Sequence, residues 1–452
     1  MSNFQSSSGR AAAFAALSAA ATAAAITFIL QQRRKKRISS ALVPPKSIKE
    51  FEAEAKKRLS PLGKVYFGYV DGEGLTAKAC RNFFASIRLL PRILVGDLSD
   101  VDTSMEIFGQ KLDMPVLIAP TAFHFLACEE GEVATARGAA EAGAGYCYNW
   151  MLSSRLCSDV VEEGRTASGD GGVKWLHLYM FEEKDMVEKA IKSAEATGAF
   201  SAIILTCDHP HTRVQGRMLP YFTQLPFPEE TLDRSFFPNQ DSVGGDTITL
   251  RELLSLKGDE ENVPGGTNSS KLSWEDIKDI KRQTKLPIVA KGILSASDAR
   301  KALWNGCDAI VVSNHGGRQF DGAPSAIEAL PAVVAAVGGK IPVFVDTGVR
   351  SSTDVVKAIC LGANGVLLGR PPLWALACGG SESLQRMLCQ LKEDIRADMM
   401  SLGVRNISEL GPNLLWQPDR ERLDKIVRAC GVSKASPPSS PPRGPEQAPH
   451  SE

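Results

Sequence analysis

The stretch VVSNHGGRQFDG, residues 311–322, places an imidazole and a guanidinium three positions apart, with two glycines between them. A neutral His315 can take a proton near pH 7, and the planar fork of Arg318 can bind a carboxylate. Gly316 and Gly317 let a ligand approach the backbone closely. A loop histidine judged alone usually has no such role, but together with Arg318 it predicts proton abstraction from a carboxylate-bearing substrate.

Three residues from other parts of the chain could complete this centre. Asp208 could pair with the protonated imidazole, and Tyr179 could donate a hydrogen bond to a substrate oxygen. Lys291, in VAKG, could stabilise negative charge that develops on a cofactor or an intermediate. The alternative for Lys291 is a surface lysine that buries only its stem.

Two glycine-containing motifs near the C-terminus favour a bound phosphate. They are DTGVR (346–350) and LGRP (368–371), and each follows an apolar run. Backbone N–H groups at such glycines and at a helix N-terminus bind phosphate, and Arg350 and Arg370 would add charged hydrogen bonds. LGRP alone could also be a turn that caps a helix.

The elements that must position these groups are eight short apolar runs separated by helical patterns. The runs cover residues 115–120, 145–150, 174–180, 201–208, 286–292, 308–314, 342–348 and 365–370. Eight strand–helix units predict an α/β fold of the (β/α)8 type, a TIM barrel, rather than an open doubly wound sheet.

The polar residues fall at or just after the C-terminal ends of the runs, where barrel enzymes carry their active sites. These are Asn149, Tyr179, Asp208, Lys291, His315, Asp346 and Arg370. Seven residues far apart in sequence should therefore converge. The gap between Asp208 and Leu286 is too long for one helix and predicts an extended loop over the barrel mouth.

The composition bounds the class of protein. With 52 basic and 52 acidic residues the net charge is zero, so no nucleic-acid partner is indicated. The ten cysteines contain no C-x-x-C pair, which predicts a reduced chain without a disulfide framework or a structural zinc site. We expect a targeting segment and linker over 1–47, the barrel domain over 48–432, and a disordered Pro/Ser-rich tail over 433–452.

The N-terminal hydrophobic segment covers residues 11–30, which are uncharged and followed by RRKKR. Twenty helical residues span about 30 Å, so we expect a single-pass membrane anchor with the catalytic domain on the cytoplasmic side. The alternative is a transit peptide for a mitochondrion or another organelle, because the segment is rich in alanine and no acidic residue precedes Glu50.

Several of these motifs resemble those of one family. SNHGGRQFDG is similar to the signature of the FMN-dependent α-hydroxy-acid oxidases and dehydrogenases, such as glycolate oxidase. The resemblance continues through RNFFASIRLLPRIL (81–94), LTCDHP, LPIVAKGILSASDA, VFVDTGVRSSTDV and GVLLGRP, and it covers nearly all of residues 48–410.

The resemblance implies that FMN is the cofactor and that the chain oxidises an (S)-2-hydroxy acid to a 2-oxo acid. Oxygen is then the expected electron acceptor, hydrogen peroxide the product, and a homo-oligomer the expected assembly. His315, Asp208 and Tyr179 would be catalytic, and Arg318, with Tyr179 and His315, would bind substrate. The implied FMN contacts are Pro120, Thr121, Ala122, Asn149, His177, Thr206, Lys291, Ser313, Asp346, Gly348, Arg350, Gly369 and Arg370.

The chain departs from the family pattern at its carboxylate clamp. A tyrosine of the family's VYDYYASG-like stretch aligns with Gly68, and a second substrate arginine aligns with Gln215. Other departures are Asn149 for a serine, Met151 for a tryptophan and His177 for a flavin-contacting glutamine. Because a lost charged hydrogen bond costs about 1.5–3 kcal/mol, we expect altered specificity or slower turnover on small 2-hydroxy acids.

Three other functions remain open from the sequence. The predicted anchor would suit a membrane-bound L-lactate dehydrogenase that reduces quinone. Gly68 and Gln215 would suit a flavin-binding protein that has lost catalysis. DHPH (208–211) would suit a metal-dependent hydrolase, although no matching carboxylate–histidine set recurs on another run, so we expect no metal.

Overall fold

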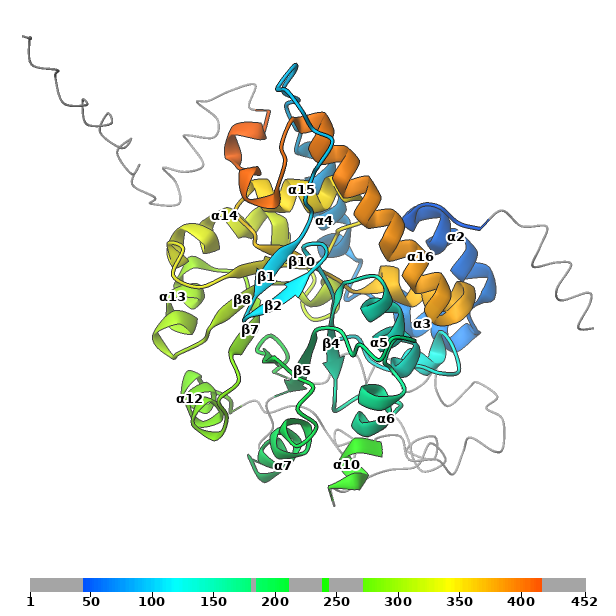
Figure 1. Cartoon of the computed structure of the whole chain (residues 1–452). Coiled ribbons are helices and arrows are strands. Elements are labelled where there is room, and N and C mark those ends of the chain that lie inside the picture. Colours follow the sequence, from blue (N-terminus) through cyan, green and yellow to red (C-terminus); the bar gives the residue numbers. More distant parts are fainter. Residues whose placement is uncertain (1–43, 180–183, 211–237, 244–270, 417–452) are drawn as a thin grey trace, which may run out of the picture. The chain divides into compact units, whose positions relative to one another are not determined.

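The computed structural model describes residues 44–179, 184–210, 238–243 and 271–416. Eight parallel strands form a closed barrel in the order β10-β3-β4-β5-β6-β7-β8-β9 (Figure 1). The predicted (β/α)8 barrel is therefore confirmed. Seven strands lie inside a predicted run, and β7 extends one residue beyond its run. The strands are β3 (Val116–Ile118), β4 (Gly145–Asn149), β5 (Lys174–Tyr179), β6 (Ala202–Thr206), β7 (Ile288–Ile293), β8 (Ala309–Val312), β9 (Val343–Val345) and β10 (Gly365–Leu368).

The interior of the barrel is filled by one inward-facing side chain from most strands. Trp175 of β5 and Phe344 of β9 meet there edge to face, with ring centroids 5.4 Å apart. An antiparallel hairpin of β1 (Met105–Ile107) and β2 (Gln110–Leu112) adds Ile107 and Leu112 to this cluster. Since Phe108 also packs on Trp175, the hairpin closes the end opposite the C-terminal ends of the strands.

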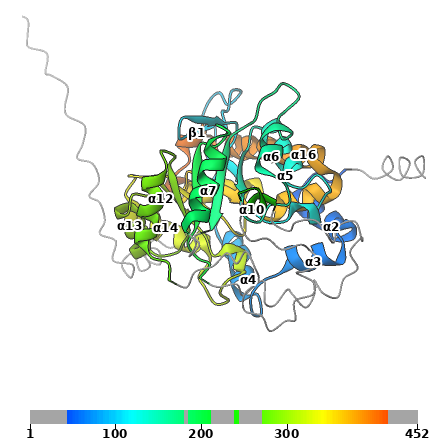
Figure 2. The same cartoon turned by 90° about the horizontal axis from the view of Figure 1, so that it is seen from below.

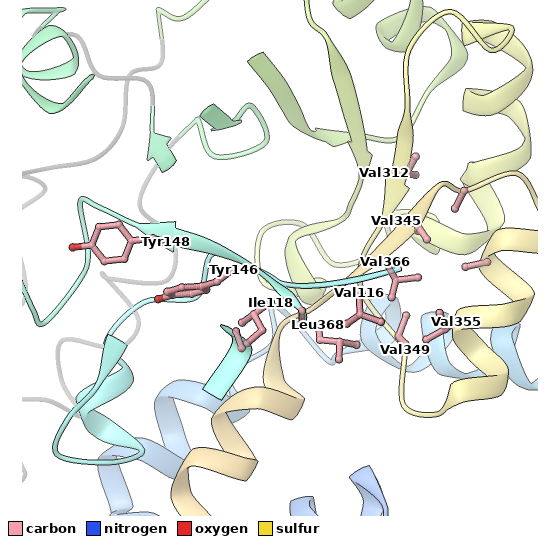
Figure 3. Close-up of a cluster of buried hydrophobic side chains, with 14 of the residues drawn as sticks. Val116, Ile118, Tyr146, Tyr148, Val312, Val345, Val349, Val355, Val366 and Leu368 are labelled. Carbon is pink, nitrogen blue, oxygen red and sulfur yellow. The ribbon is translucent and has the colours of Figure 1, made fainter. Parts of the chain in front are cut away.

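The outward faces of the strands are covered by helices. Figure 3 shows part of this layer, in which valines of β3, β9 and β10 lie near Val349 and Val355. The connecting helices are α5 (Glu132–Glu141), α6 (Cys157–Glu162), α7 (Lys184–Glu195), α12 (Trp274–Gln283), α13 (Ala296–Trp304), α14 (Ala326–Val337), α15 (Ser352–Cys360) and α16 (Arg370–Leu402). Ser295 and Ser351 begin α13 and α15, where each side chain accepts a backbone N–H of the first turn.

Three helices precede the barrel: α2 (Ile48–Arg58), α3 (Pro61–Gly68) and α4 (Leu75–Ser86). Figure 2 shows α3 between α2 and α4 along one side of the barrel. α2 packs on α16, and α4 packs on α14 and on the turn η2 (His315–Gly317). These helices therefore lie beside the loops that follow β8, β9 and β10.

The long helix α16 is kinked at Gly379 and Gly380, whose backbone angles are not helical. The kink frees the carbonyl of Cys378, which accepts a hydrogen bond of 2.6 Å from Arg58 Nη1. The N-terminal part of α16, next to β10, is thereby fastened to the end of α2.

The gap between Asp208 and Leu286 contains two described helices, so it is not an extended loop throughout. Its last part is the helix α12, which packs beside α7, and its middle contains the short helix α10 (Pro238–Ser242). The amide of Asn239 donates to the Tyr148 hydroxyl and to the carbonyls of Trp150 and Arg155. α10 is thus fixed over the end of β4, and residues 211–237 and 244–270 lie outside the described part.

The predicted terminal segments, 11–30 and 433–452, also lie outside the described residues. Within the described part, no helix combines the length and the apolar character needed to cross a bilayer. All nine cysteines of that part are free thiols. The anchor and the tail therefore stay predictions.

Candidate active site

A cavity opens at the C-terminal ends of the barrel strands. The space that no protein atom fills amounts to about 840 Å³, part of it open to solvent, which is within the range of small-molecule sites. Twelve of the predicted site residues line it: Pro120, Thr121, Ala122, Tyr179, Lys291, His315, Arg318, Asp346, Gly348, Arg350, Gly369 and Arg370. Five others, Asp208, Asn149, His177, Thr206 and Ser313, lie at the same strand ends outside the lining.

His315 and Asp208 form the central pair of the site. The distance from His315 Nδ1 to Asp208 Oδ1 is 3.0 Å, and the side chains are only 18% and 16% exposed. Burial raises the pKa of Asp208, but the positive charges of His315 and Lys291 outweigh it and hold that pKa at about 2. An ionised carboxylate can only accept, so Nδ1 carries the proton and Nε2 keeps its lone pair.

Burial lowers the pKa of His315, and the nearby Lys291 lowers it further, while Asp208 raises it. The imidazole is therefore neutral near pH 7 and able to accept a proton. Its backbone has φ +57°, a left-handed conformation that is rare for a residue with a side chain. Ser313 Oγ holds this conformation by accepting the N–H of His315 at 3.0 Å.

Arg318 is held by the C-terminal end of α3. Its Nη1 donates to the carbonyls of Tyr66 at 2.8 Å and Tyr69 at 3.3 Å. Its guanidinium lies over both tyrosine rings, 5.1 Å and 5.4 Å from their centroids. Nε and Nη2 make no hydrogen bond with the described residues, so this side of the fork can hold a carboxylate.

Tyr179 lies between two histidines, with ring centroids 4.8 Å from His177 and 5.2 Å from His209. Burial raises the pKa of Tyr179, which keeps its phenol protonated as a donor. Burial also takes the pKa of His177 well below its usual value, so this imidazole is neutral. His177 Nε2 pairs with Thr206 Oγ1 at 2.7 Å, whereas Nδ1 is buried without a partner in the described part.

Lys291, in the second half of β7, is a buried cation and not a surface lysine, with 5% of its side chain exposed. Its Nζ lies 3.7 Å from Asp346 Oδ2. Burial lowers the pKa of Lys291, but Asp208 and Asp346 outweigh that effect and raise it overall. A permanent positive charge therefore faces the cavity, as the position of Lys291 in the sequence predicts.

The loops after β9 and β10 carry the two predicted phosphate arginines. Arg350 stacks on Trp374 at 5.0 Å, and its Nε is buried without a partner in the described part. Arg370 is engaged more fully, since it donates to the carbonyls of Phe67, Tyr69 and Gly316. Arg350 is therefore the arginine with donors left for an anion. Gly348, at φ +100°, lies so close to Cys80 and Phe84 that a Cβ would meet them at 3.1–3.2 Å.

A buried network fixes the loop after β3. Thr121 Oγ1 pairs with His124 Nε2 at 2.6 Å, and His124 Nδ1 pairs with Thr135 Oγ1 at 2.7 Å. The carboxylate of Glu132 accepts the N–H of His124 and the N–H of Ser154. Glu132 thus ties the loop after β3 to the loop after β4, which positions Thr121 in the cavity.

Sequence reasoning did not assign Tyr66, Phe67 and Thr347, which also line the cavity. Thr347 has φ +66°, and its hydroxyl accepts the N–H of Gly316 and donates to Asp346. Its place beside Gly348 in DTGVR was the available signal. Tyr66 lines the cavity through a helix whose position relative to the barrel no local pattern predicts.

Of the two departures at the carboxylate clamp, the described part of the structure contains one. Gly68 is exposed, and a Cβ there would meet no atom within 4 Å. Gln215 lies outside the described residues. Asp208 of the DHPH motif is bonded to His315, and among the described residues no group of three or more His, Cys, Asp or Glu could hold a metal.

Comparisons with known proteins agree with this geometry. The family model of the FMN-dependent dehydrogenases matches residues 55–417. Rat 2-hydroxyacid oxidase 2 is 38% identical over 81% of this chain and 97% of its own length. Spinach glycolate oxidase is 36% identical over 80% of this chain and 94% of its own length. A mandelate oxidase solved with benzoyl-formic acid superposes with a TM-score of 0.67 and 32% identity, covering 82% of this chain and 97% of the other.

The cavity fits FMN, the cofactor that this family model specifies. Pro120, Ala122 and Leu367 give apolar walls for a flat ring system. The ammonium of Lys291 and the unpartnered nitrogens of His177 and Asn149 suit its polar edge. The unpartnered Nε of Arg350, beside Gly348, suits the phosphate.

Proposed function

The chain belongs to the FMN-dependent dehydrogenase family, and on that premise we propose that it oxidises an (S)-2-hydroxy acid to a 2-oxo acid. Oxygen is the proposed electron acceptor, with hydrogen peroxide as the product. The observation that carries the proposal is the His315–Asp208 pair in the same cavity as Arg318. The names of the relatives, which are oxidases of 2-hydroxy acids, glycolate and mandelate, support it.

The proton step belongs to His315. Its Nε2 takes the proton that the substrate loses, from the hydroxyl group or from C2, because Nδ1 donates to the ionised Asp208. The carboxylate of Asp208 then stabilises the imidazolium. Bound FMN supplies the acceptor for the two electrons that leave C2.

Substrate orientation belongs to Arg318 and Tyr179. The free side of the Arg318 fork binds the substrate carboxylate, and the Tyr179 hydroxyl donates to the oxygen on C2. Lys291 and the neutral His177 would hold the polar edge of FMN, where the positive charge of Lys291 would stabilise the negative charge of the reduced cofactor.

The proposed specificity differs from that of a small-acid oxidase. Gly68 has no side-chain donor that could assist Arg318, whose free side we assign to the substrate carboxylate, whereas Lys291 and Arg350 are assigned to the cofactor. A substrate with additional contacts elsewhere, such as a longer or aromatic side chain, would offset this loss.

The test is anaerobic reduction of the bound flavin by glycolate, L-lactate, medium- and long-chain 2-hydroxy acids and (S)-mandelate. At least one should bleach the flavin rapidly, and reopening to air should consume oxygen and form peroxide. His315→Gln should abolish bleaching while the protein stays yellow. A flavin that none of these acids reduces, or that quinone but not oxygen reoxidises, would overturn the proposal.

We further propose that residues 11–30 anchor the chain in a membrane, with the barrel on the cytoplasmic side, and that the barrel assembles as a homo-oligomer. The support is the uncharged run before RRKKR and the family itself. Carbonate extraction of membranes and light scattering of the detergent-solubilised chain test the two parts separately. A chain that carbonate releases, or a monomeric mass, would contradict the respective part.

A further inference from the structure

A second cavity lies outside the barrel mouth, between α2, α3 and α4. It is lined by residues of these three helices and by the loops after β9 and β10. Its unfilled space amounts to about 1230 Å³, including open solvent. We call it the α2–α4 cavity. It meets the cofactor cavity at five residues that line both: Phe67, Thr347, Gly348, Arg350 and Arg370.

The α2–α4 cavity carries a surplus of positive charge. Six cationic residues and two carboxylates line it. One pair cancels, because Lys56 Nζ lies 2.7 Å from Glu52. Lys64 and Arg81 make no side-chain hydrogen bond or ion pair with any described residue, and Lys78 donates only to the carbonyl of Glu73.

The phosphate of FMN does not account for this surplus. It carries close to two negative charges, which the two buried arginines of the shared loops can match. Burial lowers the pKa of Arg350 to about 10, and Arg81 acts in the same direction. Arg81 is therefore near enough to repel Arg350, and an anion between Lys64, Lys78 and Arg81 would relieve that repulsion.

The other walls of the cavity are apolar. Leu59 and Phe67 are buried beneath it, and Trp374 lies on the side of α16. A binding site that joins cations from separate elements to apolar side chains suits an anion with an attached apolar group, rather than a simple inorganic ion.

We propose that the α2–α4 cavity binds a phosphorylated ligand that carries an apolar or aromatic group, such as a nucleoside diphosphate. Lys64, Lys78 and Arg81 hold its phosphates, next to the loop that holds the phosphate of FMN. Two sources share this chemistry. The ligand is a separate molecule, or it is the outer half of a dinucleotide flavin whose inner half occupies the FMN site.

The first experiment is calorimetric titration of the full-length, FMN-loaded protein with ADP at low ionic strength. We expect saturable binding at one site per chain with a Kd below about 1 mM. Lys64→Glu and Arg81→Glu should each weaken ADP binding at least tenfold, about 1.4 kcal/mol. Both side chains are exposed, so these substitutions should leave folding intact.

Lys49→Glu is the matched control. Lys49 lies on α2, is exposed and does not line the cavity, so the same change of charge should alter Kd less than twofold. If Lys49→Glu and Arg81→Glu weaken ADP binding equally, the effect comes from the net charge of the protein and not from this cavity, and the proposal is overturned. Flavin content and reduction by a 2-hydroxy acid, measured on the same samples, report on the oxidase function independently.

The second experiment separates the two sources. The FMN-loaded protein is dialysed against FAD, and the retained flavin is identified by chromatography. ADP binding with FMN retained supports a separate ligand. If FAD replaces FMN, and Arg81→Glu weakens this exchange while Lys49→Glu does not, the ligand is the outer half of a dinucleotide flavin. If the protein binds no ADP at 10 mM and also does not exchange FMN for FAD, the assignment of the cavity is overturned.

Discussion

The imidazole rings of His209 and His315 lie 5.6 Å apart, centroid to centroid, at an angle of 36°. His209 also packs on Tyr179. His209, which follows Asp208 in the sequence, therefore contacts both the proposed base and the proposed donor. The charge of His209 also lowers the pKa of Asp208 and the pKa of His177, so His209 contributes to the electrostatic environment of the site.

His209→Phe keeps a ring in place and removes the charge. Two positive charges 5.6 Å apart in water repel by about 0.7 kcal/mol, half a unit of pKa. Without that repulsion His315 binds its proton more readily. The pH below which flavin reduction slows should therefore rise by about half a unit. The measurement is the pH profile of anaerobic reduction; an unchanged or lowered limb would refute the electrostatic role.

Asp208→Asn should reduce the rate of flavin reduction by at least about 100-fold, the usual worth of a positioned acid–base group. The substitution removes the charge that raises the pKa of His315, and the amide can donate to Nδ1 and so favour the wrong tautomer. Stopped-flow absorbance measures the rate. The flavin-to-protein ratio should stay at its normal value, since Asp208 lies outside the lining of the cavity; a colourless variant would contradict this separation of roles.

Arg318→Lys should weaken binding of a 2-oxo acid about 10- to 150-fold, because a lysine cannot hold a carboxylate in two places. The same guanidinium is bonded to the carbonyls of Tyr66 and Tyr69, so the melting temperature should also fall. Flavin difference spectra give the affinity and calorimetry gives the melting temperature. A loss of affinity without any loss of stability would argue that these carbonyl contacts contribute little.

Gly68→Tyr should fold normally, since a Cβ at this position meets no atom within 4 Å and its φ is not left-handed. The family resemblance predicts that a tyrosine here donates to the substrate carboxylate, so the affinity for glycolate and lactate should rise about tenfold. Gly68→Phe is the control without a hydroxyl. Equal effects of Tyr and Phe would show that bulk, and not the hydroxyl, changes the affinity.

The fold was predictable because each of the eight strands is a short β-rich run whose end carries polar residues. The helix α12 was harder to predict, because it lies in the long gap after Asp208, and only its capping box at Ser273 and Asp276 indicates where it begins. α10 has no apolar period at all. Its placement depends on Asn239, a side chain whose four partners, Tyr148, Trp150, Arg155 and Cys157, are distant in sequence.

The site was predictable where a residue lies within or shortly after its own strand, as Lys291, His315 and Arg350 do. It was not predictable where two elements meet. The sequence predicts that Arg370 binds a phosphate. Nothing in it indicates that the guanidinium also donates hydrogen bonds to the carbonyls of Phe67 and Tyr69. Such contacts depend on the packing of α3 against the barrel, which is set by tertiary structure.

The hairpin of β1 and β2 also has a kinetic consequence. Ile107 and Leu112 lie in the barrel core and Phe108 packs on Trp175, so the hairpin closes the N-terminal end of the barrel. In the described part, small molecules can then enter and leave the site only through the mouth. The proposed hydroxy-acid substrate, keto-acid product and oxygen would then share one passage. A keto acid that leaves slowly delays the arrival of oxygen, so its rate of departure would decide whether turnover proceeds through free reduced enzyme or through a ternary complex.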